Sequence, residues 1–364
     1  TDNIRMEDSD AISESQMIAT ANFGGILDGD YHTITNLKNT IFFRAYGSES
    51  NYVQVKNLIS YGANINTTDF NNYHGTGLIC AHSKYLTIDS VLLVDSIVMG
   101  AYNTGYFVGD VRGPTNVYNS GSAGGRLSAN RSVGSFGGIL GFTYNDGGAS
   151  GVYNVKDVFA INTDFTPPSG VATQDNGGIC GNGGRVAGGS SIVNTYTAND
   201  VGIPNSIYTG PIIGNSSGNV VLENAIYNWD TIKNQSFNFL NTNGTRLTTA
   251  TMVGDNLKSS FDKKSGGIWS YAAGYYPRLT WLKDHPISNL YTATRGAFTS
   301  VDNATNITDM FNGNISGVIK IPEELQKSSY SYASSNTNVL KVTEGGTIIP
   351  VGSVNSTAKI TITY

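Results

Sequence analysis

The sequence contains few charged residues and almost no cysteine. Charged side chains make up 13% of its 364 residues, and 22 Lys and Arg nearly balance 27 Asp and Glu, for a net charge of −5. A chain without a basic excess is poorly suited to nucleic acid, so we expect no nucleic-acid partner. Cys80 and Cys180 are too few for a disulfide framework, and this low cysteine use fits a bacterial export route.

Long apolar runs are also missing. No stretch approaches the roughly 20 apolar residues that a membrane-spanning helix needs, so we expect no membrane insertion. The chain starts at Thr1 rather than Met and ends inside a strand-like stretch, 358–364. These ends predict a fragment cut from a longer protein, in which missing targeting signals carry no information.

The usual catalytic motifs are absent from the sequence. There is no His-Glu-x-x-His pair, no Gly-x-x-x-x-Gly-Lys-Ser/Thr loop, and no Gly-x-Ser-x-Gly between a strand and a helix. Carboxylates are scattered, and Asp28-Gly29-Asp30 is more typical of a turn than of a catalytic pair. We therefore predict no catalytic residue, no cofactor and no enzymatic activity for this chain, a prediction that does not extend to its parent protein.

One group of residues resembles a set of metal ligands. His74, Cys80 and His82 lie close in sequence, but a structural zinc site takes four ligands and no fourth is evident. We predict that Cys80 faces inward on a strand, that His82 lies at a turn, and that no metal is bound.

A short repeat organises most of the chain. The pattern Gly-x-x-x-Gly/Ala with apolar residues between recurs five times, starting at Gly77, Gly105, Gly137, Gly177 and Gly210. Each unit continues into an alternating apolar-polar run, which often contains Asn. The runs have strand length and are separated by polar, Gly-rich turns. Asn occurs in these runs at Asn36, Asn57, Asn119, Asn194 and Asn224.

Such units bury an apolar face only when they are stacked. We therefore predict an all-β chain whose main part is a parallel β-helix, right-handed by the crossover rule, with glycines that supply positive φ at the coil corners. A β-sandwich with coincidental glycine spacing is the alternative. The alignment puts Cys80 and Cys180 three coils apart. At ~4.8 Å per coil this separation is too long for a disulfide, so both thiols should be free and buried.

The repeats resemble the GLUG repeats of bacterial surface adhesins and secreted proteases, including proteases that cleave immunoglobulin. The opening stretch 23–37 and the closing stretch 251–281, with Trp269 and Trp281, are similar to the first coil and the end of those β-helices. The resemblance covers about residues 20 to 283 and implies a fold more than an activity. We expect domain 1–283 to be this β-helix. The sequence of segment 7–20 is compatible with either a helical cap or a first strand.

A second domain is expected at 287–364, after the linker Lys283–Pro286. Alternating strands at 318–322, 338–342, 346–349 and 358–362 predict a small β-sandwich. The stretch 330–342 resembles the bacterial Ig-like domains of surface proteins.

Tyrosine is abundant, with 21 residues, many of them in or beside turns. Its large ring and polar tip suit contacts with glycans and proteins, although covering loop backbone is the more usual role. Arg residues near turns line one side of the expected solenoid. The candidate ligand-binding residues are Tyr73, Tyr102, Tyr118, Tyr144, Arg112 and Arg126.

These observations favour a non-catalytic binding or spacer module of a bacterial cell-surface or secreted protein, adhesin-like, which presents a solenoid face to a host glycoprotein or glycan. One alternative is an accessory region that positions the substrate of a large secreted protease. Another is a polysaccharide lyase or hydrolase built on a β-helix. The oligomeric state does not follow from the sequence.

Overall fold

The structure is a computed structural model of the whole chain. It describes residues 4–5, 22–67, 75–129, 134–144, 151–165, 175–183, 189–201, 208–215, 220–232, 243–272, 275–282, 317–318, 331–342, 347–350, 358 and 360–363. The chain divides into two compact units, residues 1–249 with 263–265, and residues 250–262 with 266–364. Segment 7–20 and the predicted linker 283–286 lie outside the described residues.

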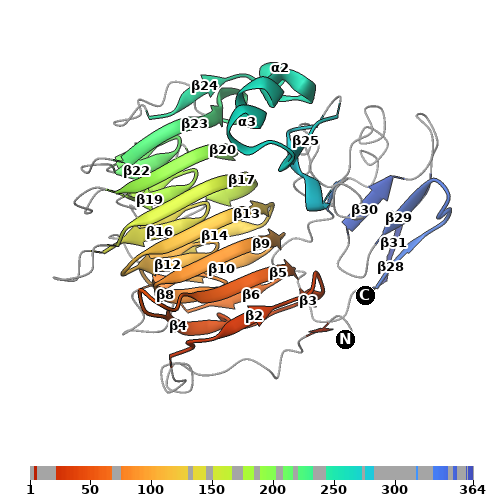
Figure 1. Cartoon of the computed structure of the whole chain (residues 1–364). Coiled ribbons are helices and arrows are strands. Elements are labelled where there is room, and N and C mark those ends of the chain that lie inside the picture. Colours follow the sequence, from red (N-terminus) through yellow and green to blue (C-terminus); the bar gives the residue numbers. More distant parts are fainter. Residues whose placement is uncertain are drawn as a thin grey trace. The chain divides into compact units, whose positions relative to one another are not determined.

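The first unit is a stack of parallel strands, coloured from red to green along the chain in Figure 1. Three sheets run along the stack. The thirteen-stranded sheet contains β1 (Ile4–Arg5), β2 (Ile26–Asp28), β3 (Thr33–Thr35), β5 (Val53–Tyr61), β6 (Asn64–Asn66), β9 (Leu86–Val94), β10 (Ile97–Gly100), β13 (Thr115–Ala123), β14 (Arg126–Ala129), β17 (Tyr153–Phe165), β20 (Ser190–Asp200), β23 (Val220–Asn228) and β24 (Thr245–Leu247).

The other two sheets carry the Gly-rich repeats. The five-stranded sheet contains β7 (Gly75–Thr76), β11 (Asn103–Gly105), β15 (Ser135–Gly137), β18 (Asp175–Gly177) and β21 (Tyr208–Gly210). The six-stranded sheet contains β4 (Phe42–Tyr46), β8 (Cys80–Lys84), β12 (Val108–Val111), β16 (Leu140–Thr143), β19 (Cys180–Asn182) and β22 (Ile213–Asn215).

One coil of the stack passes through all three sheets. From β9 the chain runs through β10, β11 and β12, and the next coil repeats the path through β13, β14, β15 and β16. Equivalent strands pair in parallel, coil on coil, as β9 does with β13 through seven residue pairs. The predicted parallel β-helix is therefore confirmed.

Glycine lets the five- and six-stranded sheets approach each other closely. A Cβ atom at Gly77 would lie 2.6 Å from the carbonyl oxygen of Phe107, and one at Gly181 would lie 2.6 Å from that of Phe136. Carbon contacts are optimal near 3.5–4.0 Å, so no side chain fits. The repeat glycines all have negative φ, because none is among the left-handed residues. The prediction that glycine supplies positive φ at coil corners is confirmed at Gly62 and Gly124. It does not hold for the glycines of the Gly-x-x-x-Gly repeat, which are needed for close contact.

The alignment of the repeats is confirmed at the two cysteines. Cys80 pairs with Val108, Val108 with Leu140, and Leu140 with Cys180, which places the thiols three coils apart. Both cysteines are free and fully buried. Burial raises the pKa of both thiols far above its ordinary value, so they stay protonated.

Left-handed residues form two columns along the stack. The first contains Tyr31, Asn57, Ser90, Asn119, Asp157, Asn194 and Asn224. The second contains Asn36, Gly62, Asp95, Gly124 and Asn162. Each column is one residue per coil, in register, at a bend of the thirteen-stranded sheet. Asn, Asp and Gly tolerate this backbone best, which explains the recurring Asn.

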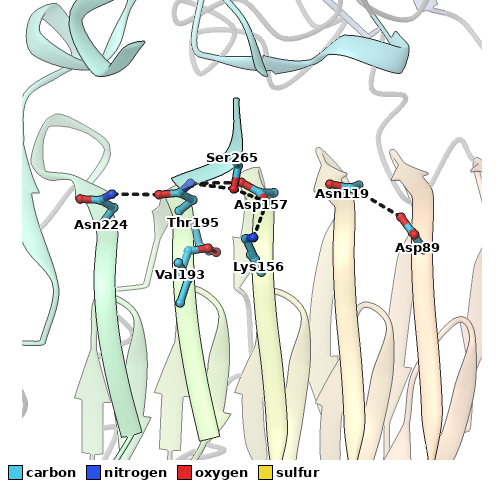
Figure 2. A network of polar contacts seen from close by, with 9 residues as sticks. Asp89, Asn119, Lys156, Asp157, Val193, Thr195, Asn224 and Ser265 are labelled. Carbon is cyan, nitrogen blue, oxygen red and sulfur yellow. Dashed lines mark hydrogen bonds and ion pairs between the residues drawn. The ribbon is translucent and has the colours of Figure 1, made fainter. Parts of the chain in front are cut away.

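Side chains of the first column hydrogen-bond from coil to coil, as Figure 2 shows. Asn224 Nδ2 donates to Asn194 Oδ1 over 2.9 Å, and Asn194 Nδ2 donates to Asp157 Oδ1 over 3.3 Å. Ser265 Oγ closes this part of the column, since it donates to Asp157 Oδ2 over 2.7 Å and accepts from Asn194. Asn119 Nδ2 donates to Asp89 Oδ1 over 3.0 Å. The column therefore fixes the bend and links neighbouring coils.

The described helices follow the last strands of the first unit along the chain. They are η2 (Trp229–Thr231), α2 (Thr249–Met252), η3 (Gly254–Leu257), α3 (Lys258–Ser265) and η4 (Thr280–Leu282). In the second unit β25 (Trp269–Ser270) pairs with β26 (Arg278–Leu279), and buried Phe261 packs on Trp269 with ring centroids 5.2 Å apart.

Antiparallel strands follow in the predicted second domain. One sheet contains β27 (Gly317–Val318), β29 (Leu340–Val342) and β30 (Thr347–Pro350). The other pairs β28 (Ser331–Ser334) with β31 (Ile360–Thr363). Two antiparallel sheets suit a small sandwich, while the Ig-like assignment and the boundaries 1–283 and 287–364 stay predictions.

A glycine substitution tests the close contact of the sheets. In Gly141→Ala the new Cβ would lie 2.6 Å from the Gly109 carbonyl oxygen and 2.9 Å from Thr104 backbone. We expect a loss of about 2 kcal/mol or more in the free energy of unfolding, measured by denaturant titration. Gly24→Ala is the control, since its nearest atom is 3.8 Å away; an equal loss in both variants would contradict the contact model.

A pair of substitutions tests the left-handed column. Asn119 has φ 45°, so Asn119→Ala should be less stable than Asn119→Gly by about 1 kcal/mol, because only Gly avoids the Cβ clash. Asn116 is the control on the same strand, with ordinary φ. There the order should reverse, with Ala at least as stable as Gly in thermal unfolding.

Candidate functional site

Two rows of polar and aromatic side chains run across the first four strands of the six-stranded sheet. In the first row Arg44 pairs with His82, His82 with Asp110, and Asp110 with Phe142. In the second row Tyr46 pairs with Lys84, and Arg112 and Tyr144 follow the paired residues Val111 and Thr143. We call these eight residues the cation–aromatic face.

Cations and rings are in contact throughout this face. The Arg44 guanidinium carbon lies 5.0 Å from the ring centroid of Phe43 and 6.0 Å from that of Tyr46. The Arg112 guanidinium lies 5.0 Å from the ring centroid of Tyr144, and Lys84 Nζ 5.8 Å from that of Tyr85. Such contacts orient a cation and leave its outer side to solvent. Arg44 is exposed, and Tyr144 retains 36% of its accessible surface.

A buried carboxylate anchors the centre of the face. Asp110 is fully buried and accepts hydrogen bonds from Asn103 Nδ2 over 2.9 Å and from Arg112 Nη2 over 3.2 Å. Arg112 Nε lies 3.1 Å from His82 Nδ1, which itself lies 3.3 Å from Asp110 Oδ2. A neutral imidazole accepts from Arg112 through Nδ1, whereas an imidazolium donates to Asp110. With a neutral imidazole, Arg112 is fixed by both His82 and Asp110; with an imidazolium, it is fixed by Asp110.

The surroundings of Asp110 keep it ionised. Burial alone would raise the pKa of this carboxyl, but the hydrogen bond and charge of His82, the Arg112 guanidinium and the Asn103 amide together hold the pKa below its ordinary value. The charge of Asp110 is therefore present at neutral pH, where it orients Arg112.

A second buried acid–amide pair is Asp175–Asn182, in which the acid precedes the amide along the chain, the reverse of Asn103–Asp110. Asp175 accepts from Asn182 Nδ2 over 2.7 Å, from Ser135 Oγ over 3.1 Å and from Asn215 Nδ2 over 3.2 Å. Asn103–Asp110 and Asp175–Asn182 both span seven residues, on either side of a Gly-rich corner. Because the donors at Asp175 come from three coils and it is 2% exposed, this pair locks the sheets together.

The structure brings together two of the six predicted binding residues, Arg112 and Tyr144. Tyr102 is half-buried before β11, and Arg126 begins β14, where its Nη2 lies 3.6 Å from Met99 Sδ. Tyr118 lies on β13, on another face of the stack. Tyr73 lies outside the described residues.

Tyr118 belongs to the outward face of the thirteen-stranded sheet. Burial, with Tyr52 and Asp89 nearby, raises the pKa of its hydroxyl. Beside it, side chains hydrogen-bond across four coils: Asn116 donates to Thr87, Asn154 to Asn116, and Ser191 to Asn154, over 2.9–3.4 Å. Charged residues there are compensated, as in Lys56–Asp28 at 3.1 Å.

The other residues of the face were not predicted as ligand contacts, among them Arg44, Lys84 and Asp110. His82 was expected at a turn, which was wrong: it lies inside β8, because the strand continues beyond Cys80 to Lys84. A signal existed, since the face residues follow each repeat's apolar residue by two and four positions. Asp28 does form the predicted turn, accepting from the Asp30 amide over 3.0 Å.

Within the described part of the chain, no three His, Cys, Asp or Glu side chains are grouped so that they could hold a metal ion. Nor is any helix there long and apolar enough to cross a membrane.

Comparison with known proteins gives one similar solved structure. It is a crystal structure at 1.30 Å resolution of a "putative immunoglobulin A1 protease" from Bacteroides ovatus, with 16% sequence identity and a TM-score of 0.49, covering 77% of this chain and 84% of that one. No family model matches the chain, and no curated protein matches it. The similarity to GLUG repeats and Ig-like domains therefore stays a prediction from the residues.

The pKa of Asp110 makes a prediction about acid stability. A carboxyl whose folded-state pKa is depressed stabilises the fold above the unfolded value, near pH 4, and loses this contribution as pH falls through the folded value. Asp110→Asn should lower the free energy of unfolding at pH 7 by about 1–3 kcal/mol, and with it the unfolding temperature. The free energy of unfolding of this variant should change less between about pH 5 and pH 3 than that of the wild type. Calorimetry checks this, with exposed Asp255→Asn as the control. Parallel pH profiles for wild type and Asp110→Asn would contradict the assignment.

Proposed function

We propose that this chain is a non-catalytic binding module of a secreted or cell-surface bacterial protein, which presents the cation–aromatic face to a host glycoprotein or glycan. The observation that carries the proposal is the row Tyr46, Lys84, Arg112 and Tyr144, in which two cations lie between two rings across four consecutive coils. Tyr and Arg are the residues that contribute most to recognition surfaces, because they combine large contact area with hydrogen bonding.

The face is better suited to holding a ligand than to cutting one. Glycosidases need two carboxyl groups that reach the substrate. The carboxyl group of the face, Asp110, has no accessible surface and is engaged by Arg112 and Asn103. Arg112 in turn is held by Asp110 and His82, and a guanidinium stays protonated rather than acting as a base. The arrangement orders the cations without exposing an acid.

The location outside the cell rests on the resemblance of the repeats to those of bacterial surface proteins. A solenoid also suits this role physically, since its stacked coils provide a long, rigid side surface for an extended ligand. The antiparallel sheets of the second unit would then act as a stalk.

Binding to a panel of host glycoproteins and glycans tests the proposal. Wild-type chain should bind a subset, and Tyr144→Ala should weaken that binding about tenfold, because it removes the ring under Arg112. Tyr118→Ala is the matched control on a different face and should bind as wild type does. The panel is also assayed for cleavage of each ligand.

Three results would contradict the proposal. Absence of all binding at high protein concentration would leave a spacer role. Release of new chain ends from a bound glycan would make the chain an enzyme. A loss confined to Tyr118→Ala would place the binding surface on the thirteen-stranded sheet instead.

A further inference from the structure

The cation–aromatic face is a local region of positive charge on an acidic chain. Arg44, Lys84 and Arg112 come from three consecutive coils, and neither Arg44 nor Lys84 pairs with a carboxylate in the described part of the chain. The carboxylate within the face, Asp110, is fully buried and balances Arg112. The face therefore carries an excess of positive charge, although the whole chain has net charge −5.

The spacing of these cations is set by the fold. Neighbouring coils lie ~4.8 Å apart, so a polymer lying along the stack meets a cation on each of three successive coils. Tyr46 and Tyr144 stand at the two ends of the second row. A ligand unit that combines a flat apolar surface with an anionic group would satisfy both kinds of side chain at once.

We propose that the ligand of this face is an acidic polysaccharide, a glycan whose units carry carboxylate or sulfate groups. The inference rests on the proposed function and names the ligand class for the same face. Guanidinium groups bind such oxyanions through two parallel N–H donors, and a lysine binds them as a point charge. Arg44 and Lys84 supply these groups, while the rings of Tyr46 and Tyr144 contact the sugar.

His82 adds a donor between the two rows. Nε2 carries a proton both when a neutral ring accepts from Arg112 through Nδ1 and when an imidazolium donates to Asp110, and Nε2 makes no hydrogen bond to another described residue. The side chain keeps 6% of its accessible surface. His82 Nε2 is thus held in place by Arg112 or Asp110 to donate to one oxygen of the anion.

An acidic peptide fits this face less well than a glycan. Peptides usually gain affinity by adding a strand to an open sheet edge. Here β8 pairs with β4 and β12, and β12 pairs with β8 and β16. The edge strand β4 is bonded on its outer side by Phe23, whose N–H donates to the Arg44 carbonyl and whose carbonyl accepts from the Tyr46 N–H. What the face offers is side chains alone, in a fixed array, which suits a polymer recognised by charge and ring stacking.

Titration of the full chain with defined polymers tests the inference. The probes are polygalacturonate as the carboxylated glycan, dextran sulfate as the sulfated one, dextran as the neutral one and polyglutamate as the acidic peptide. We expect binding to one or both acidic glycans, weaker by at least about threefold on going from about 50 mM to about 200 mM salt. Which of the two binds more tightly distinguishes carboxylate from sulfate.

Charge-matched variants locate the binding. Arg44→Ala with Lys84→Ala should weaken acidic-glycan binding about tenfold, and the conservative pair Arg44→Lys with Lys84→Arg should retain most of it. Lys263→Ala, an exposed lysine of α3, is the control for net charge and should change affinity less than twofold. Circular dichroism and thermal unfolding confirm that each variant is folded.

The outcomes separate this inference from the proposed function. Salt-independent binding, equal binding of dextran, binding of polyglutamate as tight as that of polygalacturonate, or an equal loss in Lys263→Ala would overturn the acidic-glycan assignment. If host glycoproteins or neutral glycans still bind through Tyr144, the proposed function survives. If nothing binds at all, both fail.

Discussion

The closeness of the five- and six-stranded sheets is the constraint on which the rest of this structure depends. The two sheets approach until a Cβ atom at Gly77 or Gly181 would overlap a backbone carbonyl of the neighbouring strand. Only glycine allows that distance, so the repeat is read from sequence as Gly-x-x-x-Gly. When the two sheets lie this close, the residues between the glycines must turn the chain within one corner. The strands beyond the corner then carry Cys80, Val108, Leu140 and Cys180 into the core at one position of every coil. The pairs Asn103–Asp110 and Asp175–Asn182, whose members are seven residues apart, connect the two sheets at the same corner.

The bends of the thirteen-stranded sheet are fixed by a different device. A left-handed residue in each coil turns the chain, and its side chain pairs with the next coil, as Asn224 does with Asn194 and Asn194 with Asp157. Ser90 and Asp157 replace Asn in this column without breaking it, because Asp89 and Ser265 supply the missing partners. The column therefore tolerates substitution when a neighbour compensates. This tolerance explains why Asn recurs less regularly along the sequence than the glycines of the repeat do.

The order in which the coils stack could be predicted from the sequence, but the physical causes of that order could not. The spacing of five Gly-x-x-x-Gly units was enough to align Cys80 with Cys180 and to predict free thiols, because a steric requirement leaves a rigid pattern. Positive φ at corner glycines was predicted correctly for Gly62 and Gly124 but does not apply to the repeat glycines, since a close approach and a positive φ both select glycine and cannot be separated by composition. Two of the eight residues of the cation–aromatic face were predicted from sequence. Arg112 and Tyr144 were identified by type, whereas Arg44 lies on β4, whose coil begins with Phe42 and has no glycine signature. Asp110 could not be identified as a buried anchor, because its role depends on Asn103 and His82 meeting it across coils.

The distribution of charge separates the two faces that a ligand could meet. On the outward side of the thirteen-stranded sheet, Lys56 pairs with Asp28 and Lys264 with Glu223, at 3.1 Å and 2.7 Å, and the amides between them bond to each other. A ligand there would have to displace interactions that already exist. On the six-stranded sheet the one carboxylate of the face is buried, and it fixes Arg112, while Arg44 and Lys84 have no acidic partner among the residues that the structure describes. Burial of Asp110 thus has two effects: it orders one guanidinium, and it removes the negative charge from the surface that the other cations share. The stacked fold places Arg44, Lys84 and Arg112 on three successive coils, so this local excess of charge becomes a row that matches an extended anion.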